Sequence, residues 1–427
     1  MSKLPILVSL LFLLSSFGGI NQRSSADPNF KTNIGWVNNA LRGAEFAFDN
    51  LRYPTGNYFQ DTKNVLATSC WDNFSQFGAL IAFGTQQILQ FHNIDLGMAA
   101  LQVAADILDW QLQYFWNPEP PGGFYAFSYT DGSHLDTSVQ YSDDNCFAGV
   151  VLYESYLLLI SLNDTHSPLA GDPFVISLMQ TTIQQSELCA RWAINSQAWA
   201  GIFGGGFWWN VSTTSPGYNQ DSFRPDNALF LCANLFVELF DDNANPLYLA
   251  WAQKSLNWGY KVLYNSQSNL FSWYSDLNNT INTAVFVYAN ALGAYAFHRY
   301  GVVTQDPSAQ AFALNLSNSI YETFWSAEAN AFFESSVAPW AVSTTLSGWA
   351  SKSLYQIALY HQSPALLEAC CHNVEFVQRH LRDSFSGAYY DSATLNGDVP
   401  PSILDYFSTL NVAWGQWLAV TLSPFCH

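Results

Sequence analysis

Positive charge is scarce in this sequence. Its 427 residues include 14 Lys and Arg against 33 Asp and Glu, which gives a net charge of −19 at pH 7. A chain with this charge is repelled by nucleic acid and by anionic membrane surfaces. The composition therefore predicts that neither is a partner, and it favours a ligand that is neutral or cationic.

Cysteine is also sparse, with seven residues and no C-x-x-C pair. An odd number leaves at least one thiol unpaired, and we expect that thiol to be buried. The run Cys370-Cys371-His372 is a poor metal site, because on a helix three successive side chains point in different directions. No His-Glu-x-x-His motif and no phosphate-binding glycine motif is present. We expect no metal and no cofactor.

Long apolar runs are missing beyond the N-terminus, where none reaches the roughly 20 residues of a membrane span. The N-terminus itself combines a basic residue, Lys3, with an apolar stretch from Leu4 to Phe17 and small residues at 24–26. This order predicts a signal peptide over residues 1–26 and a secreted, extracellular protein without a membrane span. Asn-x-Ser/Thr triplets predict glycosylation at Asn73, Asn163, Asn210, Asn278 and Asn315.

No Pro-, Ser- or charge-rich linker divides residues 27–427, so we expect one domain and a monomer. Apolar residues recur at helical spacing in about twelve segments of similar length. The predicted helices are 33–51, 73–92, 95–115, 144–161, 172–197, 226–240, 246–264, 283–300, 306–325, 345–361, 364–381 and 402–421. Such an all-α pattern predicts an (α/α)6 barrel, with short β-hairpins near 204–209 and 387–390.

The long connections of this barrel are rich in Gly, Trp, Tyr, Asn and Asp. They cover 116–143, 199–225, 265–282, 327–344 and 382–401. Loops held by a rigid scaffold are where binding residues concentrate. The composition therefore predicts that the binding residues lie in these connections.

Two adjacent carboxylates, Asp143 and Asp144, stand where such a connection enters a long apolar helix. Helix capping explains one aspartate at this position but explains two less well. Glycosidic bond cleavage needs two carboxyl groups, and neighbouring residues favour the roughly 5 to 5.5 Å separation of retaining enzymes. One carboxyl must then hold its proton, which apolar surroundings and an ionised neighbour promote.

A second aspartate pair serves as an internal comparison. Asp241-Asp242 follows a predicted helix and precedes Asn243-Ala244-Asn245-Pro246, so we interpret it as a solvated, structural turn. On the helix near 283–300, His298 and Arg299 are expected to close the last turn, where positive charge suits the helix dipole.

The segment Gly204-Gly205-Gly206-Phe207-Trp208-Trp209-Asn210 is the second candidate binding feature. Its glycines permit close backbone approach, and paired tryptophans can present one ring to a sugar while burying the other.

Together with Asn227-Ala228-Leu229-Phe230, these segments resemble glycoside hydrolase family 76, the α-1,6-mannanases, over about residues 34–420. The resemblance implies an (α/α)6 barrel in which Asp143 is the nucleophile and Asp144 the general acid/base of a retaining reaction. It also implies a substrate cleft formed by Tyr141, Phe147, Gly205, Gly206, Trp208, Trp209 and Asn227.

This sequence departs from the family pattern at three places. Phe147 replaces the usual Trp, Ala228 replaces a Glu, and residues 283–287 read Thr-Ala-Val-Phe-Val instead of Thr-Tyr-Asn-Gln-Gly. The resulting hypothesis is a secreted retaining hydrolase of α-1,6-mannosidic linkages in mannan-type glycans. The alternatives are another α-glycan hydrolase or transglycosidase on the same fold, and a non-catalytic secreted carbohydrate-binding protein.

Overall fold

A computed structural model describes residues 28–52, 59, 67–129, 137–213, 223–401, 408–422 and 426. The predicted signal peptide lies outside these residues. The described helices are α2 (Pro28–Phe46), α3 (Cys70–Leu89), α4 (Ile94–Tyr114), α5 (Ser142–Leu162), α6 (Pro173–Asn195), α7 (Asp226–Asn243), α8 (Pro246–Val262), α9 (Val287–Thr304), α10 (Pro307–Phe324), α11 (Thr344–Tyr360), α12 (Pro364–Phe376) and α13 (Thr409–Leu422). Two π-helical turns, Ala47–Leu51 and Val377–Leu381, extend α2 and α12, and a 3-10 turn covers Gly201–Phe203.

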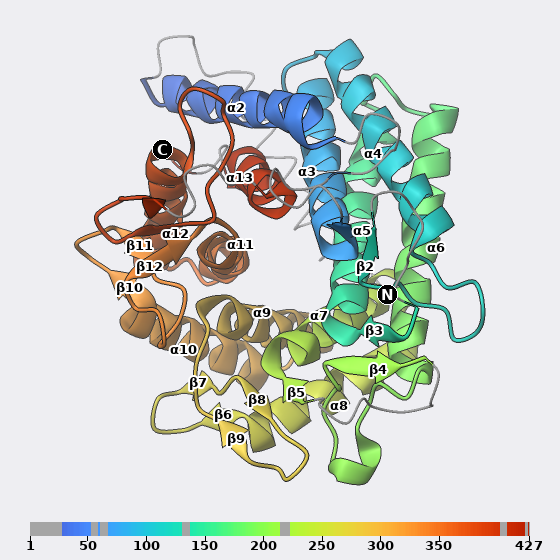
Figure 1. The fold of residues 1–427 in the computed structure, drawn as a ribbon, viewed down its shortest axis with the longest axis vertical. Coiled ribbons are helices and arrows are strands. Elements are labelled where there is room, and N and C mark those ends of the chain that lie inside the picture. Colours follow the sequence, from blue (N-terminus) through green and yellow to red (C-terminus); the bar gives the residue numbers. More distant parts are fainter. Residues whose placement is uncertain are drawn as a thin grey trace.

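The helices form two concentric rings (Figure 1). The odd-numbered helices α3 to α13 form the inner ring, in which each helix packs against the next and α13 closes onto α3. The even-numbered helices α2 to α12 lie outside them. This arrangement confirms the predicted (α/α)6 barrel, and each predicted helix overlaps one of those described.

Burial separates the two rings as the sequence pattern suggests. The inner helix α7 is buried without interruption from Asp226 to Leu239, whereas the outer helix α8 buries six of its 17 residues. Among the described helices, α5 is also long and apolar enough to cross a membrane by length and composition. Because α5 is mostly buried inside the barrel, its apolar surface is accounted for by packing against other helices.

The outer helices carry a recurrent start signal. Proline occupies the beginning of α6, α8, α10 and α12, after Asp172, Asn245, Asp306 and Ser363 respectively. The first three of these side chains accept N–H groups from the first helical turn. Proline has no N–H to leave unpaired there, so this combination marks a helix start in the sequence.

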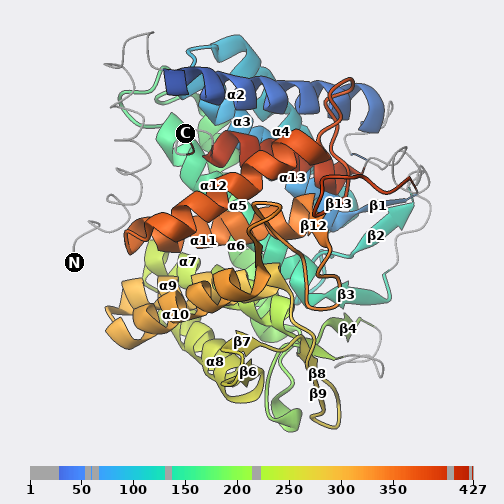
Figure 2. The same cartoon turned by 90° about the vertical axis from the view of Figure 1, so that its left-hand side faces the viewer.

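Short antiparallel strands gather at the end of the barrel where inner helices begin (Figure 2). The pairs are β1 (Ala67–Ser69) with β2 (Phe127–Tyr129), β3 (Val139–Tyr141) with β4 (Asn210–Ser212), β6 (Tyr264–Asn265) with β7 (Leu270–Phe271), β10 (Trp325–Ser326) with β11 (Ala331–Phe332), and β12 (Ala341–Ser343) with β13 (Ser392–Thr394). A three-stranded sheet joins β5 (Arg224–Pro225), β8 (Tyr274–Ser275) and β9 (Ile281–Asn282) in that order.

Each connection from an outer to an inner helix begins with the same bridged turn. A residue just after the outer helix pairs with an aromatic residue seven or eight positions later. The six pairs are Arg52–Phe59, Trp116–Phe124, Trp199–Phe207, Tyr264–Phe271, Trp325–Phe332 and Arg382–Tyr389. All six aromatic partners are 0% exposed, so each turn inserts one ring into the core. The hairpins predicted near 204–209 and 387–390 are two of these six turns.

Buried asparagines attach three of these turns to the inner helix that follows. Asn73, Asn145 and Asn290 are each the fourth residue of their helix. Their side chains pair with both the N–H and the C=O of Phe59, Phe124 and Phe271 respectively. These bonds satisfy backbone groups that burial would otherwise leave unpaired.

Two predicted glycosylation sites are wrong for the folded chain. Asn73 is fully buried in the turn just described, and Asn210 in β4 is only 7% exposed. A glycan cannot be attached to either side chain without opening the structure. Asn278 and Asn315 are exposed and Asn163 is half-buried, and these three stay predictions.

The cysteines form two disulfides among the described residues, Cys146–Cys232 and Cys371–Cys426. The other three, Cys70, Cys189 and Cys370, are buried free thiols. The expected buried, unpaired thiol is therefore confirmed. Within the described part of the chain, no three His, Cys, Asp or Glu residues are placed to hold a metal ion.

The comparison pair Asp241-Asp242 differs in detail from the prediction. It lies in the last turn of α7, and Arg299 Nη2 donates to Asp241 Oδ2 at 2.9 Å. Arg299 is not in the last turn of its helix, because α9 continues to Thr304. The pair is structural as expected, but an ion pair holds it in place of solvent.

Candidate active site

Asp143 and Asp144 are the second and third residues of α5, directly after strand β3. The N-cap position belongs to Tyr141, and no side chain caps this helix end. Asp143 Oδ1 accepts only the N–H of its neighbour Asp144, at 3.2 Å. Capping therefore does not account for the two carboxylates.

Asp143 is held by two side-chain donors from other elements. Trp209 Nε1 and Asn227 Nδ2 each donate to Asp143 Oδ2 at 3.0 Å. The carboxyl group is nearly buried, and this burial raises its pKa to about 6, against the lowering effect of the hydrogen bonds. Asp143 is thus fixed in orientation, and it is the carboxyl of the pair whose ionised form receives side-chain hydrogen bonds.

Asp144 has a different environment. Among the described residues, no hydrogen bond or ion pair engages its carboxyl group, and the residue is partly exposed. Burial raises its pKa well above the ordinary value, and the negative charges of Asp143 and Asp72 raise it further. The protonated form of Asp144 is therefore favoured more than in a free aspartate, and no described residue accepts that proton.

Backbone bonds place the two donors beside the pair. Strand β3 pairs with β4, and Ser142 N donates to Trp209 O at 2.8 Å. Asn227 is the second residue of α7, which packs against α5. Its N–H donates to Asp226 Oδ1 at 2.8 Å. The donors thus come from the ends of two different connections that only the barrel brings together.

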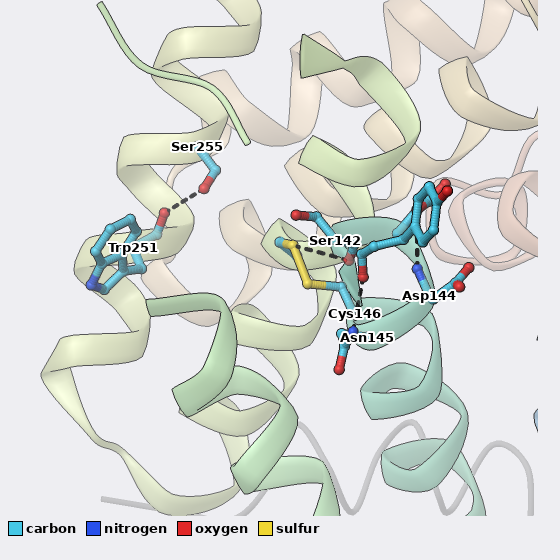
Figure 3. Close-up of a disulfide and its surroundings, with 9 residues drawn as sticks. Ser142, Asp144, Asn145, Cys146, Trp251 and Ser255 are labelled. Atoms are coloured by element: carbon cyan, nitrogen blue, oxygen red, sulfur yellow. Dashed lines mark hydrogen bonds between the residues drawn. A yellow bond between two sulfur atoms is a disulfide. The ribbon is translucent and has the colours of Figure 1, made fainter. Parts of the chain in front are cut away.

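The disulfide Cys146–Cys232 joins α5 to α7 close to these contacts (Figure 3). Cys146 follows Asp144 by two residues, and Cys232 follows Asn227 by five. Both cysteines are 0% exposed. The bond therefore limits sliding of α5 against α7, and so holds the Asn227 amide at the carboxyl of Asp143.

A third carboxyl group, that of Asp226, lies at the start of α7. Asp226 is fully buried, and its Oδ2 has no hydrogen-bond partner among the described residues. Burial raises its pKa well above the ordinary value, which favours the neutral form. Neither Asp72 nor Asp226 was identified from sequence. Both stand at the start of an inner helix, and this position is the signal that points to them.

Aromatic rings surround the pair. Tyr141 meets Trp209 edge to face, with 5.1 Å between centroids. Phe147, predicted to contact substrate, is 1% exposed and stacks on Trp71 at 4.1 Å. Trp71 is the partly exposed member of that stack. Phe147 is therefore a buried residue that packs under the ring of Trp71.

The remaining predicted cleft residues have packing roles. A Cβ on Gly205 would come within 2.8 Å of Trp199 and Trp258, and one on Gly206 within 2.6 Å of Trp258. Trp208 is 2% exposed and lies against Arg224, so it has no open face for a sugar. The glycines make room for tryptophans, which corrects their interpretation as points of ligand approach.

Further aromatic residues near the pair were not identified from sequence. Tyr288 is close enough that the charges of Asp226 and Asp143 add to the effect of burial in raising its pKa. Its ring contacts Trp349, which contacts both Trp71 and Phe147. Tyr288, Trp349 and Trp71 lie on three different helices, and nothing in their local sequence distinguishes them from core residues.

No protein-family model and no curated protein sequence matches the chain. Solved structures share its fold. An α-mannanase of glycoside hydrolase family 76 from Bacteroides thetaiotaomicron superposes with a TM-score of 0.72 at 11% identity, over 91% of this chain and 96% of that one. Cellobiose 2-epimerase from Bacillus thermoamylovorans gives a TM-score of 0.68 at 11% identity, over 90% and 99%.

A third structure with this fold is the α-1,6-mannanase of Salegentibacter sp., with a TM-score of 0.62 at 15% identity, over 91% of this chain and 99% of that one. It is an inactive variant in which two neighbouring aspartates are asparagines, and it is in complex with α-1,6-mannotriose. At these identities the likeness establishes the barrel fold, which is the fold of family 76 mannanases and of sugar epimerases.

Proposed function

We propose that this protein is a secreted retaining glycoside hydrolase that cleaves α-1,6-mannosidic linkages in mannan-type glycans. Asp143 is its nucleophile and Asp144 its general acid/base. The observation that carries the proposal is the unequal treatment of two adjacent carboxyl groups. One accepts hydrogen bonds from Trp209 and Asn227, and the other has a raised pKa and no described hydrogen-bond partner.

These environments suit the two roles that glycosidic cleavage requires. A nucleophile must be ionised and held in one orientation, and the two donors to Asp143 Oδ2 do both. A general acid must carry a proton and give it to a ligand, so a protein acceptor for that proton would compete. Asp144 has no such acceptor among the described residues.

The reaction follows in two steps. An Asp143 oxygen attacks the anomeric carbon while Asp144 transfers its proton to the glycosidic oxygen. The bond from the anomeric carbon to that oxygen breaks, and the shortened glycan leaves as an alcohol. Asp144, now ionised, then takes a proton from water, whose oxygen attacks the anomeric carbon and releases Asp143. Two displacements return the original anomeric configuration.

The linkage assignment is supported by the structural likeness to the Salegentibacter α-1,6-mannanase. That protein is inactive as a variant with two neighbouring aspartates replaced, and α-1,6-mannotriose is bound to it. The adjacent Asp143 and Asp144 of this chain supply the same pair of residue types. Secretion is supported by two disulfides, which form in oxidising compartments.

Sugar epimerisation is a second candidate, because cellobiose 2-epimerase has the same fold. That chemistry moves a proton at carbon, and a base with a pKa near neutral, such as histidine, suits it. The hydrogen bonds and ring contacts described for Asp143, Asp144, Trp209 and Asn227 involve no histidine. The geometry therefore favours hydrolysis.

The test is incubation with unbranched α-1,6-mannan, with early products analysed by chromatography and by proton NMR of the new reducing ends. We expect oligosaccharides with the α-configuration. Products with the β-configuration would refute the nucleophilic role of Asp143. Saturable binding without products would indicate a carbohydrate-binding protein, and conversion of a free disaccharide to its 2-epimer would indicate the epimerase.

A further inference from the structure

Two groups of aromatic side chains flank the aspartate pair, and they differ in exposure. Toward α11 and α13, Phe147, Trp349, Trp414 and Trp417 are all at most 4% exposed and belong to the core. On the side of α7 and α9, four rings remain partly exposed: Phe223, Trp273, Tyr274 and Phe286. We call these four residues the aromatic platform.

The platform rings form an unbroken series of contacts. Phe223 lies 4.5 Å from Tyr274 and 6.0 Å from Trp273, between ring centroids. Trp273 in turn lies 5.2 Å from Phe286. The series also continues to the candidate site, because Phe223 stacks on Trp209 at 5.0 Å, and the same indole donates its N–H to Asp143.

Backbone hydrogen bonds fix the platform relative to the pair. Trp209 N donates to Phe223 O at 2.7 Å, and Asp226 N donates to Trp273 O at 2.7 Å. Asp226 immediately precedes Asn227, which holds Asp143. The platform therefore cannot shift without disturbing the residues that orient Asp143, so it is a preorganised surface.

The cation next to the platform in sequence, Arg224, is turned into the interior. Arg224 is 0% exposed, and its guanidinium donates to Phe203 O, Gly205 O and Ser275 Oγ among others. It thus binds the connections 199–225 and 265–282 to each other. The four platform side chains are themselves aromatic and uncharged, which suits the apolar face of a neutral sugar ring.

We propose that the aromatic platform binds successive sugar units of the glycan whose linkage lies at Asp143 and Asp144. The ligand is a neutral oligosaccharide with at least two units beyond the cleaved bond. This inference rests on the proposed function and extends it, because it assigns a direction and a length to the bound glycan. It also explains why the four platform rings are partly exposed, which a role in core packing would not explain.

The test compares affinities in a non-hydrolysing background, so that binding is measured without turnover. Asp144→Asn protein is titrated with α-1,6-linked mannobiose, mannotriose, mannotetraose and mannopentaose by calorimetry. The same series is repeated with Trp273→Leu and with Tyr274→Leu added. Trp340→Leu is the matched control, because Trp340 is 60% exposed at the same end of the barrel and no ring contact is described for it.

We expect affinity to rise with chain length in the Asp144→Asn protein and in the Trp340→Leu control. Trp273→Leu and Tyr274→Leu should weaken tetraose binding about tenfold and biose binding little. In the otherwise unsubstituted chain, both changes should raise KM for mannan and leave kcat and its pH profile unaltered. Circular dichroism confirms that each variant is folded.

The platform proposal would be overturned if Trp273→Leu and Tyr274→Leu left the affinity for mannotetraose unchanged. It would also be overturned if Trp340→Leu lowered that affinity by the same factor. A failure of the proposed function looks different. If no mannan oligosaccharide is cleaved or bound, the variants are titrated with a panel of neutral α- and β-linked oligosaccharides. Binding of one of these that depends on Trp273 supports the platform with a different glycan, and binding of none overturns it.

Discussion

The same dipeptide, Asp-Asp, occurs at opposite ends of two neighbouring helices with opposite outcomes. At the C-terminal end of α7, Asp241 is paired with Arg299 at 2.9 Å, and Asp242 hydrogen-bonds Tyr156. At the N-terminal end of α5, Asp143 and Asp144 have no cation partner among the described ion pairs. The difference is that the protein engages Asp241 with a cation, while neither carboxyl group of the second pair has such a partner and both are left for a ligand.

The helix dipole explains why the two pairs need different partners. Carboxylates at a helix C-terminus are disfavoured, so Arg299 offsets the charge of Asp241. Arg299 also binds both oxygens of Glu238, which is 6% exposed. Carboxylates in the first turn of a helix are favoured. The α5 site can therefore hold two acids without a cation, and its pKa values are then decided by burial and by mutual repulsion.

Asp143→Asn gives the largest expected effect and separates the two pairs by activity. It removes the nucleophile while retaining the size and hydrogen-bonding capacity of the side chain, so kcat should fall about 10⁴-fold. Asp241→Asn, the matched change in the other pair, should leave kcat within about twofold. Initial rates on α-1,6-mannan measure both. Equal losses of kcat in the two variants would mean that Asp143 is no more important for catalysis than Asp241.

Arg299→Ala should separate the pairs by stability. It leaves the buried carboxylate of Glu238 without a cation and with the Tyr295 hydroxyl as its remaining described donor, and breaking such an ion pair costs about 3–5 kcal/mol. Urea unfolding measures this loss of unfolding free energy. The residual activity of the folded fraction should be normal, since Arg299 contacts neither Asp143 nor Asp144 in the described structure. Unchanged stability would contradict the view that this ion pair holds the end of α7.

On stability, Asp144→Asn gives the smallest expected effect, and its sign is opposite to that of Arg299→Ala. The raised pKa of Asp144 means that its contribution to stability is complete below about pH 4 and is lost as pH rises through the folded-state pKa. Asparagine does not titrate, so the variant should match the parent near pH 4 and become increasingly more stable than the parent as the pH rises through the folded-state pKa of Asp144.

Melting temperatures of the two proteins, measured from pH 4 to 8, test this difference. Asp143 and Asp226 also titrate, but they are present in both proteins and largely cancel in the comparison. A cap would behave in the opposite way, because its removal destabilises a helix by about 1 kcal/mol. A variant that is less stable than the parent at pH 8 would therefore restore the capping interpretation.

Helix periodicity was a reliable guide because the barrel repeats one unit six times. Starts such as Asp172-Pro173 and Asp306-Pro307 are local, since the cap and the proline act within one turn. The bridged turns were harder to recognise, because each needs only an aromatic residue at a fixed distance beyond a helix. Their sixfold spacing is visible in the sequence once the pattern is known.

The predicted site residues likewise differ in how well the sequence could identify them. Asp143 and Asp144 stood out as adjacent charges in a chain with few charged residues. Trp209 and Asn227 were selected as ligand contacts, and the structure shows them as donors to Asp143. Trp208 and the glycines were selected by the same reasoning, but Trp208, Trp199 and Trp258 fill the space that a ligand would need.

The helices, their order and the acidic pair at a helix start could be predicted from the sequence, because they depend on neighbours within a few positions. The fixed orientation of Asp143 and the more strongly raised pKa of Asp144 could not be predicted from it. Those properties depend on Trp209, Asn227, Asp72 and the Cys146–Cys232 disulfide, which belong to separate parts of the chain. A pKa depends on burial and on hydrogen bonds to groups that are near in space. Groups from distant segments of the chain become neighbours only when the barrel closes.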